Sequence, residues 1–130
     1  MTLLDSTVLI QYLKGAEPLT SRVQATSPVE LAIPSIVAYE LEYGTLRIGS
    51  SRRRTVLSHV LANLQEVPFD GAAARAAARI RLELERSGTV IGPLDLLIAG
   101  TVVSRNAILV TSNLDEFGRI RELRLEDWSR

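Results

Sequence analysis

Short apolar runs and segments with helical spacing alternate along the chain. Thr2-Leu3-Leu4 is typical of a buried strand, and a helix that starts near Asp5-Ser6-Thr7 follows it and ends at Gly15. Because helices separate the predicted strands, the pattern favours a parallel sheet covered on both faces, an α/β layered fold. The remaining strands are predicted at 29–33, 107–111 and, as an edge strand, 123–125, and residues 67–69 are predicted to form a short extended piece.

The clearest helix is Ala-rich and runs over residues 72–86. Asp70 is placed to cap it, and Ser87-Gly88 ends it. Another helix begins at Gly92-Pro93 and carries Asp95 in its first turn. Further helices are predicted at 19–25, 35–47, 51–64 and 113–117.

The helix predicted from a cap at Ser35 to about Arg47 places one acid at the border of the core. Its core-facing side is expected to carry Val37, Leu41, Gly44 and Ile48. At about 100° per residue, Glu40 lies roughly 70° from the centre of that side, whereas Glu42 lies about 130° from it. A carboxylate next to a buried surface needs a partner, because desolvating an unpaired charge costs several kcal/mol. A cation shared with other acids would supply that partner.

Other acids lie where predicted strands end or helices begin. In an open parallel sheet, ligands bind beyond the carboxyl ends of the strands. Asp5 follows the first strand, Asp95 starts a helix, and the strand that ends at Thr111 is followed by a polar cluster of Asn113, Asp115 and Glu116. Each position also has a purely structural interpretation, as a helix cap, a favourable charge at a helix start, or a polar turn.

The composition narrows the chemistry of such a site. The chain has no cysteine and a single histidine, His59, which is predicted on a surface helix. Thiolate metal sites and thiol nucleophiles are therefore excluded, and zinc is disfavoured. Clustered carboxylates favour a hard, oxygen-binding ion such as Mg²⁺ or Mn²⁺.

Length and charge set the remaining limits. A chain of 130 residues predicts one domain spanning 1–130, and no apolar run is long enough for a membrane span or a signal peptide, so we expect a cytoplasmic protein. Fifteen basic and fifteen acidic side chains cancel, so any RNA affinity must come from local patches. The candidates are Arg52-Arg53-Arg54 and the face formed by Arg75, Arg79 and Arg86, although both also fit solvated helix faces.

Four motifs, in this order, resemble those of PIN-domain nucleases, and most closely VapC-type toxins. The first three are Asp5-Ser6-Thr7-Val8-Leu9-Ile10, Glu40-Leu41-Glu42-Tyr43-Gly44 and Gly92-Pro93-Leu94-Asp95-Leu96-Leu97-Ile98-Ala99. The fourth is Thr111-Ser112-Asn113-Leu114-Asp115-Glu116-Phe117, and Trp128 closes the chain. The resemblance covers nearly the whole chain and implies a three-layer α/β/α fold with a mostly parallel central sheet.

The resemblance also implies the roles of individual residues. Asp5, Glu40 and Asp95 match the acids that hold Mg²⁺ or Mn²⁺ for RNA hydrolysis, and Thr111 matches a polar residue that helps to hold the site together. Two positions depart from the pattern, because Thr7 stands where Asn is common and Asn113 stands where many members have a fourth acid. Asp115 or Glu116 is then the candidate for that fourth role.

Partners follow from the same resemblance. VapC-like toxins are similar in forming homodimers, in cutting RNA, possibly tRNA, and in being held inactive by a VapB-like antitoxin protein. Tyr12, Tyr39 and Tyr43 are candidates for a dimer or antitoxin surface, or for the core. The products implied are 5′-phosphate and 3′-hydroxyl ends.

Two other functions stay open at this point. A non-toxin or inactive PIN scaffold in RNA metabolism would explain Asn113 at the fourth position. A receiver-type signalling domain also gathers acids around Mg²⁺, but it needs a lysine after a late strand. The only lysine here is Lys14, in the first predicted helix.

Overall fold

The computed structural model describes residues 1–130 as five parallel strands in one sheet, surrounded by seven α-helices and one short 3-10 helix. The sheet order is β3-β2-β1-β4-β5, so β1 lies at the centre. Leu3 of β1 pairs with Ala32 of β2 on one side and with Leu109 of β4 on the other. The strands are β1 (Thr2–Leu4), β2 (Leu31–Pro34), β3 (Gln65–Val67), β4 (Ile108–Val110) and β5 (Arg124–Glu126).

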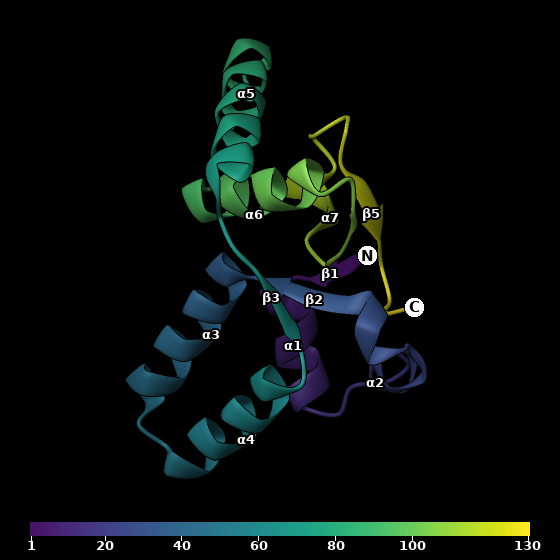
Figure 1. Ribbon diagram of the computed structural model, residues 1–130. Coiled ribbons are helices and arrows are strands. Elements are labelled where there is room, and N and C mark those ends of the chain that lie inside the picture. Colours follow the sequence, from purple (N-terminus) through teal and green to yellow (C-terminus); the bar gives the residue numbers. More distant parts are fainter.

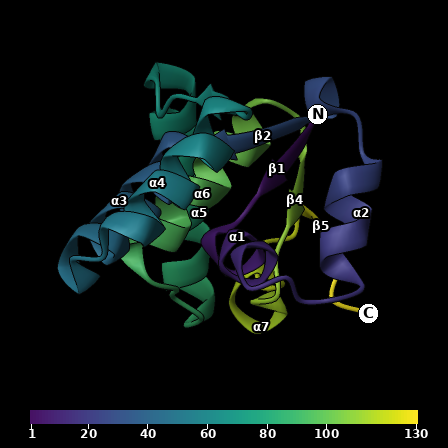
Figure 2. The same cartoon turned by 90° about the horizontal axis from the view of Figure 1, so that it is seen from below.

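The helices cover both faces of this sheet. Figure 1 shows α5 and α6 above the strands and α1, α2 and α4 below them, with α3 and α4 forming a hairpin that extends from the sheet. The view in Figure 2 places α2 on the opposite side of the strands from α5 and α6. The helices are α1 (Ser6–Leu13), α2 (Leu19–Ala25), η1 (Pro28–Glu30), α3 (Ser35–Ile48), α4 (Ser51–Ala62), α5 (Gly71–Ser87), α6 (Pro93–Ser104) and α7 (Leu114–Phe117).

The predicted three-layer α/β/α fold with a parallel sheet is therefore confirmed, together with the capping roles of two acids. Asp5 has an extended backbone and its side chain accepts a hydrogen bond from the amide of Ser6 at the start of α1. Asp70 caps α5 in the same way through the amide of Ala73. No helix combines the length and the apolar character that crossing a bilayer requires.

Two details of the predicted helix at 35–47 are wrong. Ser35 is the first residue of α3 rather than its cap, and its hydroxyl donates to Glu66 at the edge strand instead of to the helix backbone. Ile48 is 58% exposed, because α3 projects beyond the sheet before its last turn and only its first part is buried. The strand expected at 29–33 also begins later, because residues 28–30 form a 3-10 turn.

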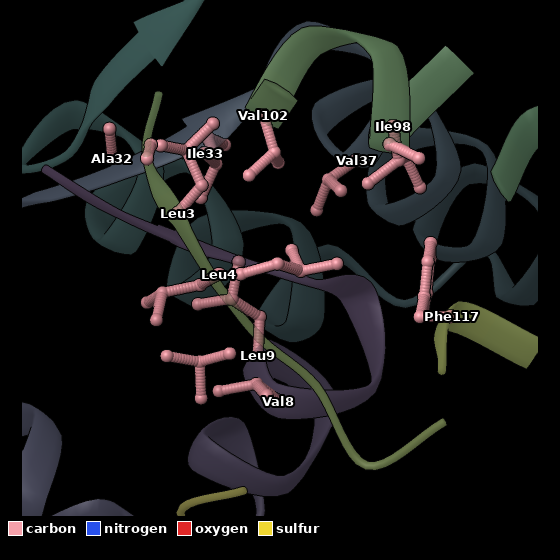
Figure 3. Packing of buried hydrophobic residues seen from close by; sticks show 14 of the residues in the cluster. Leu3, Leu4, Val8, Leu9, Ala32, Ile33, Val37, Ile98, Val102 and Phe117 are labelled. Carbon is pink, nitrogen blue, oxygen red and sulfur yellow. The ribbon is translucent and has the colours of Figure 1, made fainter. Parts of the chain in front are cut away.

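A continuous core links the sheet to both helical layers. Figure 3 shows Leu3, Ile33 and Val102 grouped together and Val8 and Leu9 of α1 below β1. Helices α5 and α6 pack closely through small residues. A Cβ built on Gly100 would lie 2.6 Å from the carbonyl oxygen of Ala73 and 2.7 Å from the Cβ of Ala77. This close approach fixes α6, which carries Asp95, against α5.

Candidate active site

The candidate site lies where the direction of the chain through the sheet reverses. After β1 the chain moves outward through β2 and β3, and it returns to the other side of β1 with β4. Loops that leave two neighbouring strands in opposite directions open a crevice at their carboxyl ends. Asp5 follows β1 and Thr111 follows β4 at this point, and the amide of Asp5 donates to the carbonyl of Val110 at 3.0 Å.

Asp5 is buried, with 3% of its surface exposed, and it is held by three donors. Its Oδ1 accepts from the amide of Ser6 at 2.8 Å. Its Oδ2 accepts from the hydroxyl of Thr111 at 2.7 Å and from that of Thr7 at 3.2 Å. A buried carboxylate is stable when hydrogen bonds replace its lost hydration. This network therefore fixes the orientation of Asp5.

The hydroxyls that hold Asp5 are themselves tied to the loop after β4. Thr111 Oγ1 accepts from the amide of Asn113 at 3.0 Å, and Thr7 Oγ1 accepts from the amide of Ser112 at 3.2 Å. The Ser112 hydroxyl in turn accepts from the side-chain amide of Gln11 at 2.8 Å. The sequence pattern missed the parts played by Gln11 and Ser112, because only the parallel pairing of β1 with β4 brings them together.

Glu40 on α3 has an oxygen without a partner. Its Oε1 is buried, and no hydrogen-bond donor reaches it. Burial, and next the negative charge of Asp5, raise the pKa of the Glu40 carboxyl above its ordinary value, while the Ser6 hydroxyl lowers it. The position at the border of the core that helical spacing predicts for Glu40 is confirmed, and so is its proximity to Asp5.

Asp95 and Glu116 form a second pair of acids in the same crevice. Burial and a hydrogen bond with Glu116, together with the charges of Asp5, Glu116 and Glu40, raise the pKa of Asp95 to about 7. The pKa of Glu116 is lowered by that hydrogen bond and by another that it accepts from Asn113. The hydrogen bond between the two carboxyls thus favours the protonated form of Asp95, the more buried of the two, and the charged form of Glu116.

The loop after β4 separates its three polar residues. The side-chain amide of Asn113 donates to Glu116 Oε2 at 3.1 Å and keeps this carboxylate beside Asp95. Asp115 is 89% exposed and pairs with Arg119 at 3.2 Å on the outer side of α7. The structure thus places Glu116 beside the other acids and Asp115 away from them. The two side chains diverge because consecutive residues of a helix point about 100° apart.

The donor set fits a hard divalent cation. Neighbouring acids raise the pKa of both Asp95 and Glu40, and the buried Oε1 of Glu40 lacks a partner. As these side chains lie, no three of them form a complete ligand cage. Binding of a cation would compete with the proton that the raised pKa of Asp95 favours, because metal binding is coupled to proton release.

The other singled-out side chains lie outside this crevice. Arg79 on α5 pairs with Glu122 at 3.0 Å, so the proposed arginine face of that helix is partly neutralised. Tyr39 and Tyr43 project from α3 and are exposed, whereas Tyr12 is half-buried against the core. His59 is exposed on α4, as expected.

Comparisons with known proteins agree with this geometry. The sequence model of the PIN domain matches residues 2–123. The chain is 40% identical to the tRNA(fMet)-specific endonuclease VapC of Salmonella typhimurium over 75% of both chains, and 34% identical to that of Shigella flexneri over 98% of this chain and 97% of the relative.

A solved structure extends the similarity to three dimensions. In the DNA-bound VapBC complex of Salmonella typhimurium, one chain superposes with a TM-score of 0.89 at 34% identity, over 98% of this chain and 97% of that one. These matches remove the receiver-type alternative, because the similarity covers the entire sheet and the acid-bearing helices. Divalent-metal dependence is general among such nucleases. The chain therefore belongs to the PIN-domain family, as a ribonuclease of the VapC toxin type.

Proposed function

We propose that the chain is the toxin of a toxin-antitoxin pair and hydrolyses RNA at a Mg²⁺ or Mn²⁺ site formed by Asp5, Glu40, Asp95 and Glu116. The observation that carries this proposal is the buried, unpartnered Oε1 of Glu40 beside Asp5, in a crevice where neighbouring acids also raise the pKa of Asp95. Without a cation, such a cluster repels itself and the phosphate of RNA alike. Its burial is therefore understandable as a binding site for a divalent ion.

The bound ion would activate water and neutralise the charge that builds up on the scissile phosphate. Asp5, whose carboxylate is oriented by three donors, would be one ligand of the ion. Asp95 would be a second, and Asn113 holds Glu116 in place beside it. Attack of water on phosphorus with cleavage of the P–O3′ bond leaves a 5′-phosphate and a 3′-hydroxyl end, the departing O3′ taking up a proton.

The partners proposed for the chain come from its relatives. Two relatives carry the name tRNA(fMet)-specific endonuclease, which supports a tRNA as substrate. Solved VapBC complexes support a VapB-like antitoxin as inhibitor, and we also propose a homodimer. With a single sheet and one continuous core, residues 1–130 would act as one nuclease domain, located where tRNA is found, in the cytoplasm.

The test is cleavage of RNA by purified protein that has been freed of antitoxin. Total RNA is incubated with Mg²⁺ or Mn²⁺, and sequencing of the RNA ends identifies the substrate and the cut. We expect cleavage that a chelator abolishes and that Asp5→Asn and Asp95→Asn each reduce by at least about a hundredfold.

A matched control separates the site from general charge effects. Asp115→Asn makes the same chemical change on α7. Because the side chain of Asp115 faces Arg119 and solvent, cleavage should stay within about twofold of the wild type. Cleavage that persists in chelator, or that survives both Asp5→Asn and Asp95→Asn, would contradict the proposed site.

A further inference from the structure

A groove is formed by residues of the helices α1, α3 and α4. It has a volume of about 590 Å³, and Glu40 forms part of its wall. Lys14, Arg52 and Arg53 line the same groove, from the end of α1 and the start of α4. The groove therefore joins one of the candidate catalytic acids, Glu40, to a group of cations.

These three cations have no acidic partner within the molecule. The six ion pairs of the chain use other arginines, and none includes Lys14, Arg52 or Arg53. All three side chains are exposed. Free cations beside an acid cluster supply the positive potential that an anionic strand needs in order to approach that cluster.

The position of the arginines indicates a role other than helix stability. Arg52 and Arg53 lie in the first turn of α4, which contains no acid. The amino end of a helix carries a partial positive charge, so cations there are electrostatically unfavourable. Arg52 and Arg53 therefore add positive potential to the groove that they line, at a cost to the helix.

The groove also offers apolar surface between its charged ends. Ile10, Ile48 and Val56 line it and are substantially exposed. A nucleotide strand presents both phosphates and the apolar faces of bases and riboses, and single-stranded RNA is bound by this combination of charge and contact surface. A neutral ligand would leave the three cations unpaired, whereas the successive phosphates of a strand can pair with them.

We propose that this groove binds the single-stranded RNA segment next to the scissile phosphate, with Lys14, Arg52 and Arg53 each contacting a backbone phosphate. The inference rests on the proposed ribonuclease function and adds the path of the substrate. It assigns different roles to neighbouring arginines. Arg54 does not line the groove, although it follows Arg53 in the sequence and is also exposed, so it should not contact the RNA.

The test compares Arg52→Gln and Arg53→Gln with the matched control Arg54→Gln. The substrate is a fluorescein-labelled RNA stem-loop that the wild-type protein cuts, followed in Mg²⁺ at several salt concentrations. Loss of one phosphate contact on a single strand lowers the slope of log affinity against log salt by about 0.7, which is about fivefold in affinity at about 0.1 M salt. We expect KM to rise by that factor for each groove variant, with kcat unchanged, and no change for Arg54→Gln.

A second measurement is the binding of the same RNA by fluorescence anisotropy in chelator, where no cutting occurs. The groove variants should weaken this binding and reduce its salt slope. Equal effects in Arg52→Gln, Arg53→Gln and Arg54→Gln would overturn the proposal, because they would show that RNA responds to the overall positive charge of this region and not to contacts in the groove. Unchanged RNA affinity in Arg52→Gln and Arg53→Gln, with weaker binding of an antitoxin, would assign the groove to that protein instead. If the wild-type protein cuts no RNA, the proposed function itself is refuted. If the wild-type protein cuts RNA and the groove variants bind and cut it equally well, only the proposed RNA-binding groove is refuted.

Discussion

Replacing Asp95 with asparagine should stabilise the metal-free protein at neutral and alkaline pH. In the folded protein the pKa of Asp95 is raised from 3.8 to about 7. At about 1.4 kcal/mol per pH unit this corresponds to about 4 kcal/mol, and we halve it to about 2 kcal/mol because the side chain is only partly buried and solvent screens it. The asparagine amide can still donate to Glu116, so the variant loses the charge but keeps the contact.

The sign of the pH dependence follows from proton linkage. Below about pH 4, Asp95 is protonated in both the folded and the unfolded chain, so its contribution is fully present. Between about pH 4 and 7 the unfolded chain ionises while the folded chain keeps the proton, and the free energy of unfolding falls as the pH rises. Above about pH 7 the loss is complete. Asp95→Asn lacks this ionisation and should not show that decline.

The assay is thermal unfolding in chelator at about pH 4 to 8, followed by circular dichroism. The gain of Asp95→Asn over the wild type should grow to about 2 kcal/mol, or roughly 6 °C in Tm, across this range. Mg²⁺ should raise the Tm of the wild type more than that of the variant, because the ion replaces the proton. A gain that does not grow with pH, or an equal gain in the exposed control Asp115→Asn, would refute the assignment of the repulsion to the acid cluster.

Three further outcomes are expected. Thr111→Val removes the hydroxyl that donates to Asp5 and leaves a backbone amide unpaired, so urea unfolding should show a loss of about 2–4 kcal/mol, with reduced cleavage. Gly100→Ala forces a methyl group against the carbonyl of Ala73, and the midpoint of thermal unfolding should fall by an amount equivalent to about 1–3 kcal/mol. Glu40→Gln removes a partly buried carboxyl whose pKa is raised, so calorimetric titration should show Mg²⁺ bound at least about tenfold more weakly.

The sequence predicted the elements of the fold well because each signal was local. A strand followed by a capping acid, an Ala-rich helix with a cap at Asp70, and Pro93 at a helix start are decided by neighbouring residues. Where the prediction failed, a distant contact decided. Ser35 donates to Glu66 across the sheet edge instead of capping α3, and nothing near Ser35 in the sequence reveals that partner.

In the candidate site, too, the residues with a local sequence signal could be predicted and those placed by distant contacts could not. Asp5, Glu40 and Asp95 could be predicted from strand ends, helical spacing and motif order. The choice between Asp115 and Glu116 depended on the direction of one short helix, α7, and on Arg119, which draws Asp115 outward. The supporting hydrogen bonds of Gln11 and Ser112 join residues 101 positions apart and therefore have no local signal.

The central position of β1 also determines when the enzyme can exist during synthesis. Its neighbour β4 is made long afterwards, and the hydrogen bond that fixes Asp5 comes from Thr111, 106 positions later. A nascent chain that has already formed β1, β2 and α3 still lacks the second wall of the crevice and the carboxylate of Glu116. Domains fold as units during translation, so nuclease activity should arise late and abruptly. A cell that makes an inhibitor alongside this chain thus has nearly the full time of translation before a dangerous species appears.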